Sequence, residues 1–444
     1  MRRRIAATAA LLLVCGGLAA CSDDDEQVGT PRPPSPVPLT GSAEGADGSA
    51  GGLGEEEPVR LGVLVSLTSA SGEGADYATR GSAAAGGAWV AAFRYGLGGR
   101  TVDLVVRDDR GRSSDAVRAV RDFADADVAG IVVASGGAHL ADARAATTGA
   151  GLPVVLPYGG TPAPTLPEGV WETGPSRDQV AAALATAAAD QGVRRPAVLW
   201  EGEEPEIPDA AVSLPVGAGE RDPDAAVRRL ARLAEAGRID GVIATGGAPT
   251  LADVVAAVQG ELSSLPVLLG PAATTPAFAE ALIGPDGRGT AAGPLSAVGV
   301  DATDATTLTA GAAGDAAAAF FAGQRLAASG GVADDVLGDF ASFGYGADIA
   351  SHDAVVALVT AAERAGSADP ADVGAALKGA TLDAGNGLAG PALDFGDARA
   401  LPDDAVRMLS PTVQSPGVRP VPVSADGGAA PVLLYWIPQP DSRG

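Results

Sequence analysis

The stretch Val128–Thr161 reads VAGIVVASGGAHLADARAATTGAGLPVVLPYGGT, and its pattern decides the fold class. Two short apolar runs, Ile131–Ala134 and Leu152–Leu156, flank a segment of helical character that begins at Ala138. Apolar runs of this length on either side of a helix are typical of parallel strands that are buried on both faces. The stretch therefore predicts a strand–helix–strand unit of an open parallel sheet.

Small residues follow both apolar runs, in the loops Ser135-Gly136-Gly137 and Tyr158-Gly159-Gly160-Thr161. Open α/β sheets bind their ligands at the carboxyl ends of the strands. We therefore predict that the two loops form one wall of a binding site. The alternative is that both are tight turns, a role that glycine fills without steric penalty.

The same pattern recurs along the chain and predicts two consecutive α/β series. Further strands of the first series are expected at Val59–Leu67, Thr101–Asp109 and Val170–Thr173. Those of the second series are expected at Pro196–Trp200, Ala211–Pro215, Gly241–Ala244 and Leu265–Leu269. Two series imply two lobes with a cleft between them. Ala291–Val300 is then expected to return the chain to the first lobe.

The amino terminus resembles the signal of a bacterial lipoprotein. Arg2, Arg3 and Arg4 precede a short apolar stretch that closes with Leu18-Ala19-Ala20-Cys21, which is similar to a lipobox. We predict cleavage after residue 20, a lipid on Cys21 and an extracytoplasmic protein anchored to the cell membrane. The alternative is an ordinary signal peptide cut near Ala20. Residues 22–58 are rich in acids, Pro, Gly and Ser, which predicts a disordered tether.

Composition excludes several classes of function. The chain has 30 Lys+Arg against 55 Asp+Glu, which argues against binding of nucleic acid. Its two histidines, His139 and His352, lie apart in the sequence, and no cluster suggests a metal site. No Gly-x-Ser-x-Gly elbow and no phosphate-binding GxxxxGK[ST] loop occurs. We therefore expect neither an enzyme nor a cofactor.

Over residues 59–400 the chain resembles the type I periplasmic solute-binding proteins of the branched-chain amino acid and amide class, which serve ABC importers. The resemblance rests on the order and spacing of segments that include Val59–Val63, Val102–Asp109, Gly151–Pro157, Glu172–Ser176, Pro196–Trp200 and Asp353–Gly366. It implies an α/β fold of two doubly wound parallel-sheet lobes joined by a three-crossover hinge. The crossovers are expected near Gly174, Ala292–Val298 and Phe395–Leu401. The implied division is a signal peptide (1–20), the tether (21–58), lobe 1 (59–174 and 292–398) and lobe 2 (175–291 and 399–444).

The resemblance also places candidate ligand contacts. The serine of the family falls on Gly136 or Gly137, with Ser135 beside them, and its threonine falls on Gly160, next to Thr161. Ala248 stands where the family has an aromatic residue, and Ala272 where it has the acid that binds the ammonium group. Further candidates are Ser69, Ser71, Tyr158, Trp200 and Glu201, from their positions at strand ends, and His139, which lies in a helical context. A buried ammonium group without an acid is costly, so a standard α-amino acid is not expected.

These features together predict a lipid-anchored, monomeric protein that carries a small solute to an ABC permease. The missing contacts leave two alternatives open. Either a larger solute fills the space that the small residues leave, or binding has been lost. In the second case the protein is a sensory relative that acts as an interaction module at the cell surface.

Overall fold

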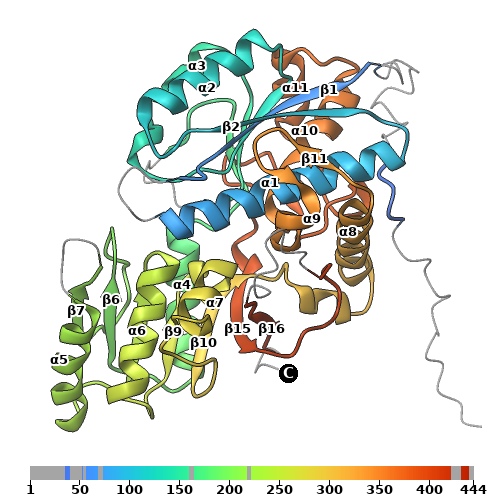
Figure 1. The fold of residues 1–444 in the computed structure, drawn as a ribbon. Coiled ribbons are helices and arrows are strands. Elements are labelled where there is room, and N and C mark those ends of the chain that lie inside the picture. The colour runs from blue at the N-terminus through green and yellow to red at the C-terminus, as the bar shows by residue number, and fades with distance from the viewer. Residues whose placement is uncertain are drawn as a thin grey trace, which may run out of the picture. The chain divides into compact units, whose positions relative to one another are not determined.

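The computed structural model describes residues 36–40, 53, 57–68, 74–159, 165–217, 222–421 and 432–439. Two larger sheets with helices packed on them carry the fold of these residues (Figure 1). Across these ranges, no helix has both the length and the apolar character that a membrane span requires.

The first sheet has five parallel strands in the order β2-β1-β3-β4-β5. The order changes direction beside β1, as in a doubly wound sheet. The strands are β1 (Val59–Val65), β2 (Val102–Asp108), β3 (Gly130–Val133), β4 (Val154–Leu156) and β5 (Val170–Glu172). The helices between them are α1 (Gly74–Leu97), α2 (Ser113–Asp125), η1 (Ala138–Leu140) and α3 (Ala141–Gly149).

Alternate side chains of β1 enter two different cores. Leu61 and Val63 pack with residues of α1 and α10 (Ile349–Ala365), whereas Leu64 packs with residues of α2 and α3. Successive side chains of a strand point to opposite faces, so this sheet is buried on both sides. That burial is why β1, β3 and β4 are largely apolar in the sequence, whereas the edge strand β2 contains Asp103 and Arg107 and is only partly buried. The predicted fold class is confirmed.

The second sheet has seven strands in the order β16-β15-β10-β9-β8-β6-β7. Five of them are parallel and repeat the winding of the first sheet, while β15 and β16 are antiparallel additions. The strands are β6 (Pro196–Trp200), β7 (Val212–Pro215), β8 (Gly241–Thr245), β9 (Val267–Leu269), β10 (Leu295–Val300), β15 (Val406–Thr412) and β16 (Tyr435–Pro438). The helices are α4 (Arg177–Asp190), α5 (Pro223–Glu235), α6 (Ala248–Glu261), η2 (Pro271–Thr274) and α7 (Pro276–Ile283).

The prediction for Ala291–Val300 is wrong in one respect. These residues do not return to the first sheet, because β10 pairs with β9 and β15 in the second. An apolar strand after a Gly/Pro turn has the same pattern in either sheet, and only its pairing decides between them. The chain passes back after Val300, through η3 (Asp304–Leu308) and α8 (Ala312–Ser329).

The remaining helical elements are α9 (Phe340–Phe343), η4 (Gly344–Gly346), α11 (Pro370–Leu377), η5 (Ala384–Asn386) and η6 (Asp403–Ala405). The remaining strands are short: β11 (Ala333–Asp334), β12 (Gly338–Asp339), β13 (Thr381–Leu382) and β14 (Leu393–Asp394).

Two connections between the sheets run side by side. One is the chain segment that follows β5, and the other is the segment that follows β14. The amide of Glu172 donates to the carbonyl of Ala398 at 2.8 Å, and the amide of Ala400 donates to the carbonyl of Glu172 at 2.9 Å. The guanidinium of Arg399 also lies 3.3 Å from the buried carboxylate of Glu172. These positions agree with the crossovers expected near Gly174 and Phe395–Leu401.

Part of the expected tether is folded, which corrects the prediction that residues 22–58 are disordered throughout. Leu39 is 6% exposed and Leu53 is 8% exposed, so both belong to the core. The guanidinium of Arg100 donates to the carbonyl oxygens of Leu53 and Glu57. Two isolated leucines within a polar segment are a weak sequence signal, because their burial depends on a matching surface elsewhere in the chain.

Candidate functional site

A cavity of about 720 Å³ lies at the carboxyl ends of strands from both sheets. Tyr158 after β4 and Thr173 after β5 line it from the first sheet. Glu201 after β6, Thr245 at the end of β8 and Ala272 after β9 line it from the second. Ligands of open α/β sheets bind at this edge, and small-molecule pockets have volumes of roughly 300–1,000 Å³. Both the position and the size are those of a small-molecule site.

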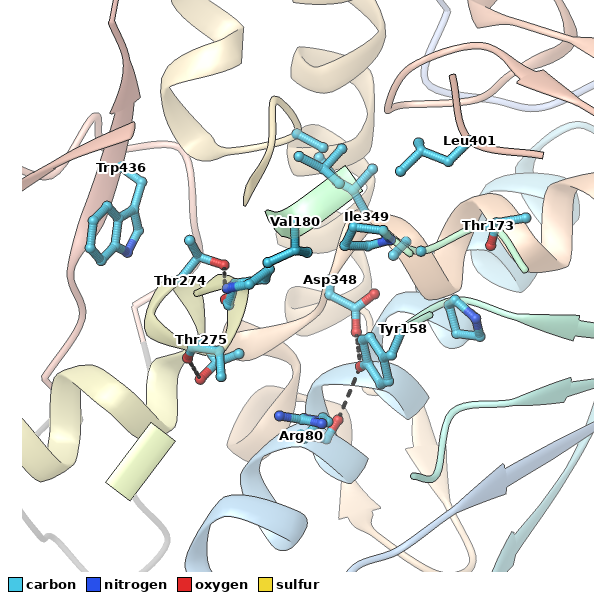
Figure 2. A pocket seen from close by; sticks show the side chains of 18 of the residues that line it. Arg80, Tyr158, Thr173, Val180, Thr274, Thr275, Asp348, Ile349, Leu401 and Trp436 are labelled. Atoms are coloured by element: carbon cyan, nitrogen blue, oxygen red, sulfur yellow. Dashed lines mark hydrogen bonds between the residues drawn. The ribbon is translucent and has the colours of Figure 1, made fainter. Parts of the chain in front are cut away.

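One wall is organised around a hydrogen bond between Tyr158 and Asp348. The Tyr158 hydroxyl donates to Oδ2 of Asp348 at 2.7 Å and lies 3.3 Å from the carbonyl oxygen of Arg80 (Figure 2). Asp348 caps α10 and accepts a hydrogen bond from the amide of Ser351 at 2.6 Å. The guanidinium carbon of Arg80 lies 5.6 Å from the centre of the Tyr158 ring, a cation–π distance. The wall therefore joins α1, α10 and the loop after β4.

Burial determines how this pair is protonated. Burial raises the pKa of Asp348, and hydrogen bonds from Ser351 and Tyr158 offset only part of the rise. Burial also raises the pKa of Tyr158 well above its usual value, and the nearby charge of Asp348 adds to the effect. Tyr158 is therefore a neutral phenol that donates its hydrogen, and Asp348 is the acceptor.

Much of the remaining wall is apolar. It includes Val180, Val300, Ile349, Leu393, Leu401 and Trp436. The hydroxyls of Thr274 and Thr275 donate to the carbonyl oxygens of Pro271 and Ala272 at 2.8 and 2.7 Å (Figure 2). Because these hydrogens are committed to the backbone, the two threonines offer a ligand acceptors rather than donors.

Acidic side chains outnumber arginines around the cavity. The carboxylates are Asp178, Glu201, Glu203, Glu204, Glu206, Asp304, Asp348 and Asp353, and the arginines are Arg80, Arg177 and Arg419. Arg177 forms an ion pair with Glu203, and Arg419 forms one with Asp304 at 2.9 Å. Arg419 also donates to the carbonyl oxygens of Tyr345 and Ala347. This balance of charge favours a neutral or cationic ligand over an anion.

Two buried polar atoms of the lining have no hydrogen-bond partner within the described ranges: Oγ1 of Thr245 and Nε1 of Trp436. Trp436 is 3% exposed, and an indole nitrogen can only donate. Buried polar groups in folded proteins are nearly always paired with protein, water or ligand. The complement of Trp436 Nε1 is therefore an acceptor atom.

Three of the site residues predicted from the sequence line the cavity: Tyr158, Glu201 and Ala272. One carboxylate oxygen of Glu201 already accepts a hydrogen bond from the amide of Gly247 at 2.8 Å, at the start of α6. Trp200 does not line the cavity, and its indole donates to Oγ of Ser213 at 3.0 Å. Ala248 is fully buried in the core of the second sheet and does not line the cavity. Gly136 and Gly137 are also absent from the lining. The predicted residues Ser69, Ser71, Gly160, Thr161 and Cys21 lie outside the described residues.

Ser135 and His139 belong to a polar cluster next to the sheet rather than to the cavity lining. Oγ of Ser66 donates to Oδ1 of Asp109 at 2.6 Å and lies 2.6 Å from Oγ of Ser135. Nε2 of His139 lies 3.1 Å from Oδ2 of Asp109 and 3.3 Å from Oγ of Ser135. A catalytic triad needs the serine and the acid on opposite ring nitrogens, whereas both partners here contact Nε2. The cluster is therefore not a nucleophilic triad.

The same cluster favours the ionised form of the Asp109 carboxyl group. Burial alone would raise the pKa of this carboxyl, but hydrogen bonds from His139, Ser66, Ser135 and the amide of Gly111 bring it below its usual value. Asp109 is thus a structural carboxylate at the end of β2. Within the described part of the chain, no group of three or more His, Cys, Asp or Glu side chains is placed to hold a metal ion.

Sequence reasoning missed several residues of the lining, among them Arg80, Asp348, Asp353, Arg419 and Trp436. An Asp directly before a helix is a capping signal, and Asp348 has that position. The signal locates the helix but does not show that the cap faces a cavity. Nothing in the local sequence around Arg419 or Trp436 indicates a site.

Comparisons with known proteins agree with this architecture. Residues 58–202 match the family model described as "Periplasmic binding protein". A comparison with curated protein sequences finds no match.

Solved structures show the same fold at low sequence identity. A periplasmic binding protein type 1 from Bordetella pertussis is 18% identical, with a TM-score of 0.60 over 83% of this chain and 100% of that one. The substrate-binding protein LivJ from Streptococcus pneumoniae, in complex with isoleucine, is 14% identical, with a TM-score of 0.56 over 79% and 99%. A solute-binding protein from R. palustris, in complex with 4-hydroxybenzoate, is 16% identical, with a TM-score of 0.58 over 87% and 99%. The resemblance to type I periplasmic binding proteins is confirmed.

Proposed function

We propose that this chain, which has the fold of the type I periplasmic binding proteins, is the solute-binding component of an ABC importer. The observation that carries the proposal is the cavity of about 720 Å³ between strand ends of the two sheets. In this proposal a small solute occupies the cavity and is delivered to a permease in the membrane. The protein works as a monomer and catalyses no reaction.

The lining supports a solute with an apolar body that is neutral or positively charged. Its walls are largely apolar, and its carboxylates outnumber its arginines. Ala272 supplies no acid for an ammonium group at the position that the resemblance assigns to one. We therefore favour a compound larger than a standard α-amino acid. Solved neighbours hold isoleucine and 4-hydroxybenzoate, so solutes of different chemistry occupy this fold.

The attachment to the membrane is part of the same proposal. Leu18-Ala19-Ala20-Cys21 follows three arginines and an apolar stretch, as in a lipoprotein signal. After cleavage Cys21 is the amino-terminal residue and carries the lipid. Because Cys15 is removed with the signal, the mature chain has no second cysteine and forms no intramolecular disulfide.

A second candidate is a binding-defective relative that acts as an interaction module at the cell surface. The observation in its favour is that Ala248 and Ala272 replace larger contacts expected from the resemblance, and Ala248 is fully buried outside the lining. The two candidates differ in one property. A transport receptor gains stability when its solute binds, whereas the interaction module does not respond to small molecules.

The test is to identify small molecules released when the purified full-length chain is denatured, with a buffer control and mass spectrometry as the readout. We expect one compound in a stoichiometric amount. That compound should raise the melting temperature of the emptied protein, and the Tyr158→Ala variant should bind it more weakly than a surface control such as Thr101→Ala. An empty cavity and no thermal shift across amino acids, amides, carboxylates and sugars would contradict the importer proposal and favour the interaction module.

A further inference from the structure

Residues Pro36–Thr40 are bound against α1 by backbone and side-chain contacts. The amide of Leu39 donates to the carbonyl of Arg94 at 2.9 Å. In the opposite direction, Nε of Arg94 donates to the carbonyl of Val37 at 2.8 Å. Leu39 is 6% exposed and belongs to the core that includes α1 and α10. The segment therefore has both a backbone pairing and a buried apolar anchor.

Two glycines, Gly98 and Gly387, leave the space that Leu39 occupies. A Cβ at Gly98 would lie 1.9 Å from the carbonyl oxygen of Leu39. A Cβ at Gly387, where φ is +95°, would lie 2.5 Å from Cδ2 of Leu39. Side chains larger than glycine at either position would collide with the segment. Two separate parts of the chain thus leave room for the same leucine.

Arg94 ties the segment to a buried polar chain. Arg94 is 2% exposed, and its guanidinium lies 2.7 Å from Nε2 of His352, whose Nδ1 lies 2.7 Å from Oδ1 of Asp353. Arginine can only donate, so Nε2 accepts and Nδ1 carries the hydrogen that His352 donates to Asp353. Burial lowers the pKa of Arg94 to about 10, so it remains charged at neutral pH. The carbonyl of Val37 therefore supplies an acceptor to a buried cation, which would otherwise be poorly solvated on that side.

We propose that Pro36–Thr40 is a latch that fixes where the tether leaves the folded part of the protein. The inference rests on the proposed lipid attachment at Cys21. The 15 residue steps from Cys21 to Pro36 span at most about 50 Å when fully extended. Without the latch the tether would run to Leu53, 32 steps from Cys21, and would span at most about 110 Å. The latch thus shortens the distance that the folded part of the protein can reach from its membrane anchor.

Hydrogen exchange of the full-length chain tests the docking. In Leu39→Ala and Gly98→Ala, we expect the peptide that contains residues 36–40 to exchange at least about tenfold faster than in the parent. The matched controls are Leu308→Ala, since Leu308 is 76% exposed, and Gly96→Ala, since a Cβ there meets no atom within 4 Å. The controls should exchange as the parent does. Equal protection in all five proteins would overturn the docking, and circular dichroism shows whether Gly98→Ala is folded.

Energy transfer to a dye in the membrane tests whether the latch limits the distance between the folded part and the membrane. Lipid occupies the thiol of Cys21, so Leu97→Cys supplies one site for a donor dye at the end of α1, where Leu97 is 46% exposed. The labelled chain is reconstituted in vesicles of phosphatidylcholine and phosphatidylglycerol that carry an acceptor on their headgroups. We expect Leu39→Ala to lose energy transfer and Leu308→Ala to keep it. If hydrogen exchange shows that Pro36–Thr40 is released in Leu39→Ala but energy transfer is unchanged, the latch does not limit the reach of the tether. A protein that does not enter the vesicle fraction would contradict both the lipid attachment and the limit on reach. The hydrogen-exchange result would still decide whether Pro36–Thr40 is docked.

Discussion

Tyr158 and Asp348 connect two parts of the chain that are far apart in sequence, because the phenolic hydroxyl of Tyr158 donates to the carboxylate of Asp348 at 2.7 Å. Tyr158 follows β4, and Asp348 caps α10. Both side chains line the cavity. The bond therefore couples the local stability of the cavity wall to the ionisation of one buried carboxyl.

Replacing the donor tests this coupling. Tyr158→Phe leaves the buried carboxylate of Asp348 without one hydrogen bond, so we expect the free energy of unfolding at neutral pH to fall by about 1–3 kcal/mol. Urea denaturation followed by circular dichroism measures the change. Tyr435→Phe on β16, which is partly exposed, is the matched control. A loss no larger than that of the control would contradict the assigned bond.

The pH dependence of Asp348 has a definite sign. Burial raises its pKa in the folded state above the unfolded value of about 3.9, so its stabilising contribution is full below that value and is lost as pH rises through the folded pKa. Asp348→Asn does not titrate. We expect the stability of this variant, relative to the parent, to improve as pH rises from about 4 to 7. Denaturation curves at four pH values would show it, and a relative stability that is constant or falls would refute the assignment.

Asp109 should behave in the opposite way. Its pKa is lowered in the folded state, so its contribution is present above the unfolded value of about 3.9 and is lost as pH falls through the folded pKa. We expect Asp109→Asn to cost about 1–3 kcal/mol at pH 7, and the cost to shrink below pH 4. The exposed Asp125→Asn serves as the control for titration of the protein as a whole. A cost independent of pH would argue against a charged Asp109.

Branched-chain amino acids provide a test of specificity. Ala272 offers no carboxylate at the position where the resemblance puts the acid for the ammonium group, so leucine, isoleucine and valine should not bind tightly. Isothermal titration calorimetry of the emptied protein gives the answer directly. A dissociation constant in the micromolar range for any of the three would contradict the specificity argued from Ala272.

Membrane attachment is tested by Cys21→Ala. If Cys21 carries the lipid, the variant should move from the membrane fraction to the soluble fraction of the extracytoplasmic space. Immunoblots of fractionated cells report the distribution, with Cys15→Ala as the matched control because residue 15 lies within the predicted signal. Unchanged fractionation of Cys21→Ala would remove the lipid anchor from the proposal.

The sequence predicted the sheets well because each strand carries its own pattern. Val154–Leu156 and Gly130–Val133 form parallel neighbours, as the stretch Val128–Thr161 indicated. The pattern did not show which sheet Leu295–Val300 joins, since an apolar strand is equally compatible with either. Pairing depends on contacts with β9 and β15 that local sequence does not encode.

Tyr158 and Glu201 were predicted from their positions at the carboxyl ends of parallel strands, and Ala272 was predicted from the resemblance; all three line the cavity. Ser135 has the same kind of position, yet its hydroxyl is held by Ser66 next to Asp109. Asp348 reaches the cavity from a helix almost two hundred residues after Tyr158, and no spacing rule connects the two.

The paired connections at Glu172 and Ala400 limit how the two sheets can move. Hydrogen bonds join the two connections at a single β-bridge. Two chain segments joined in this way do not turn independently, so a change in the angle between the sheets has to turn both of them together.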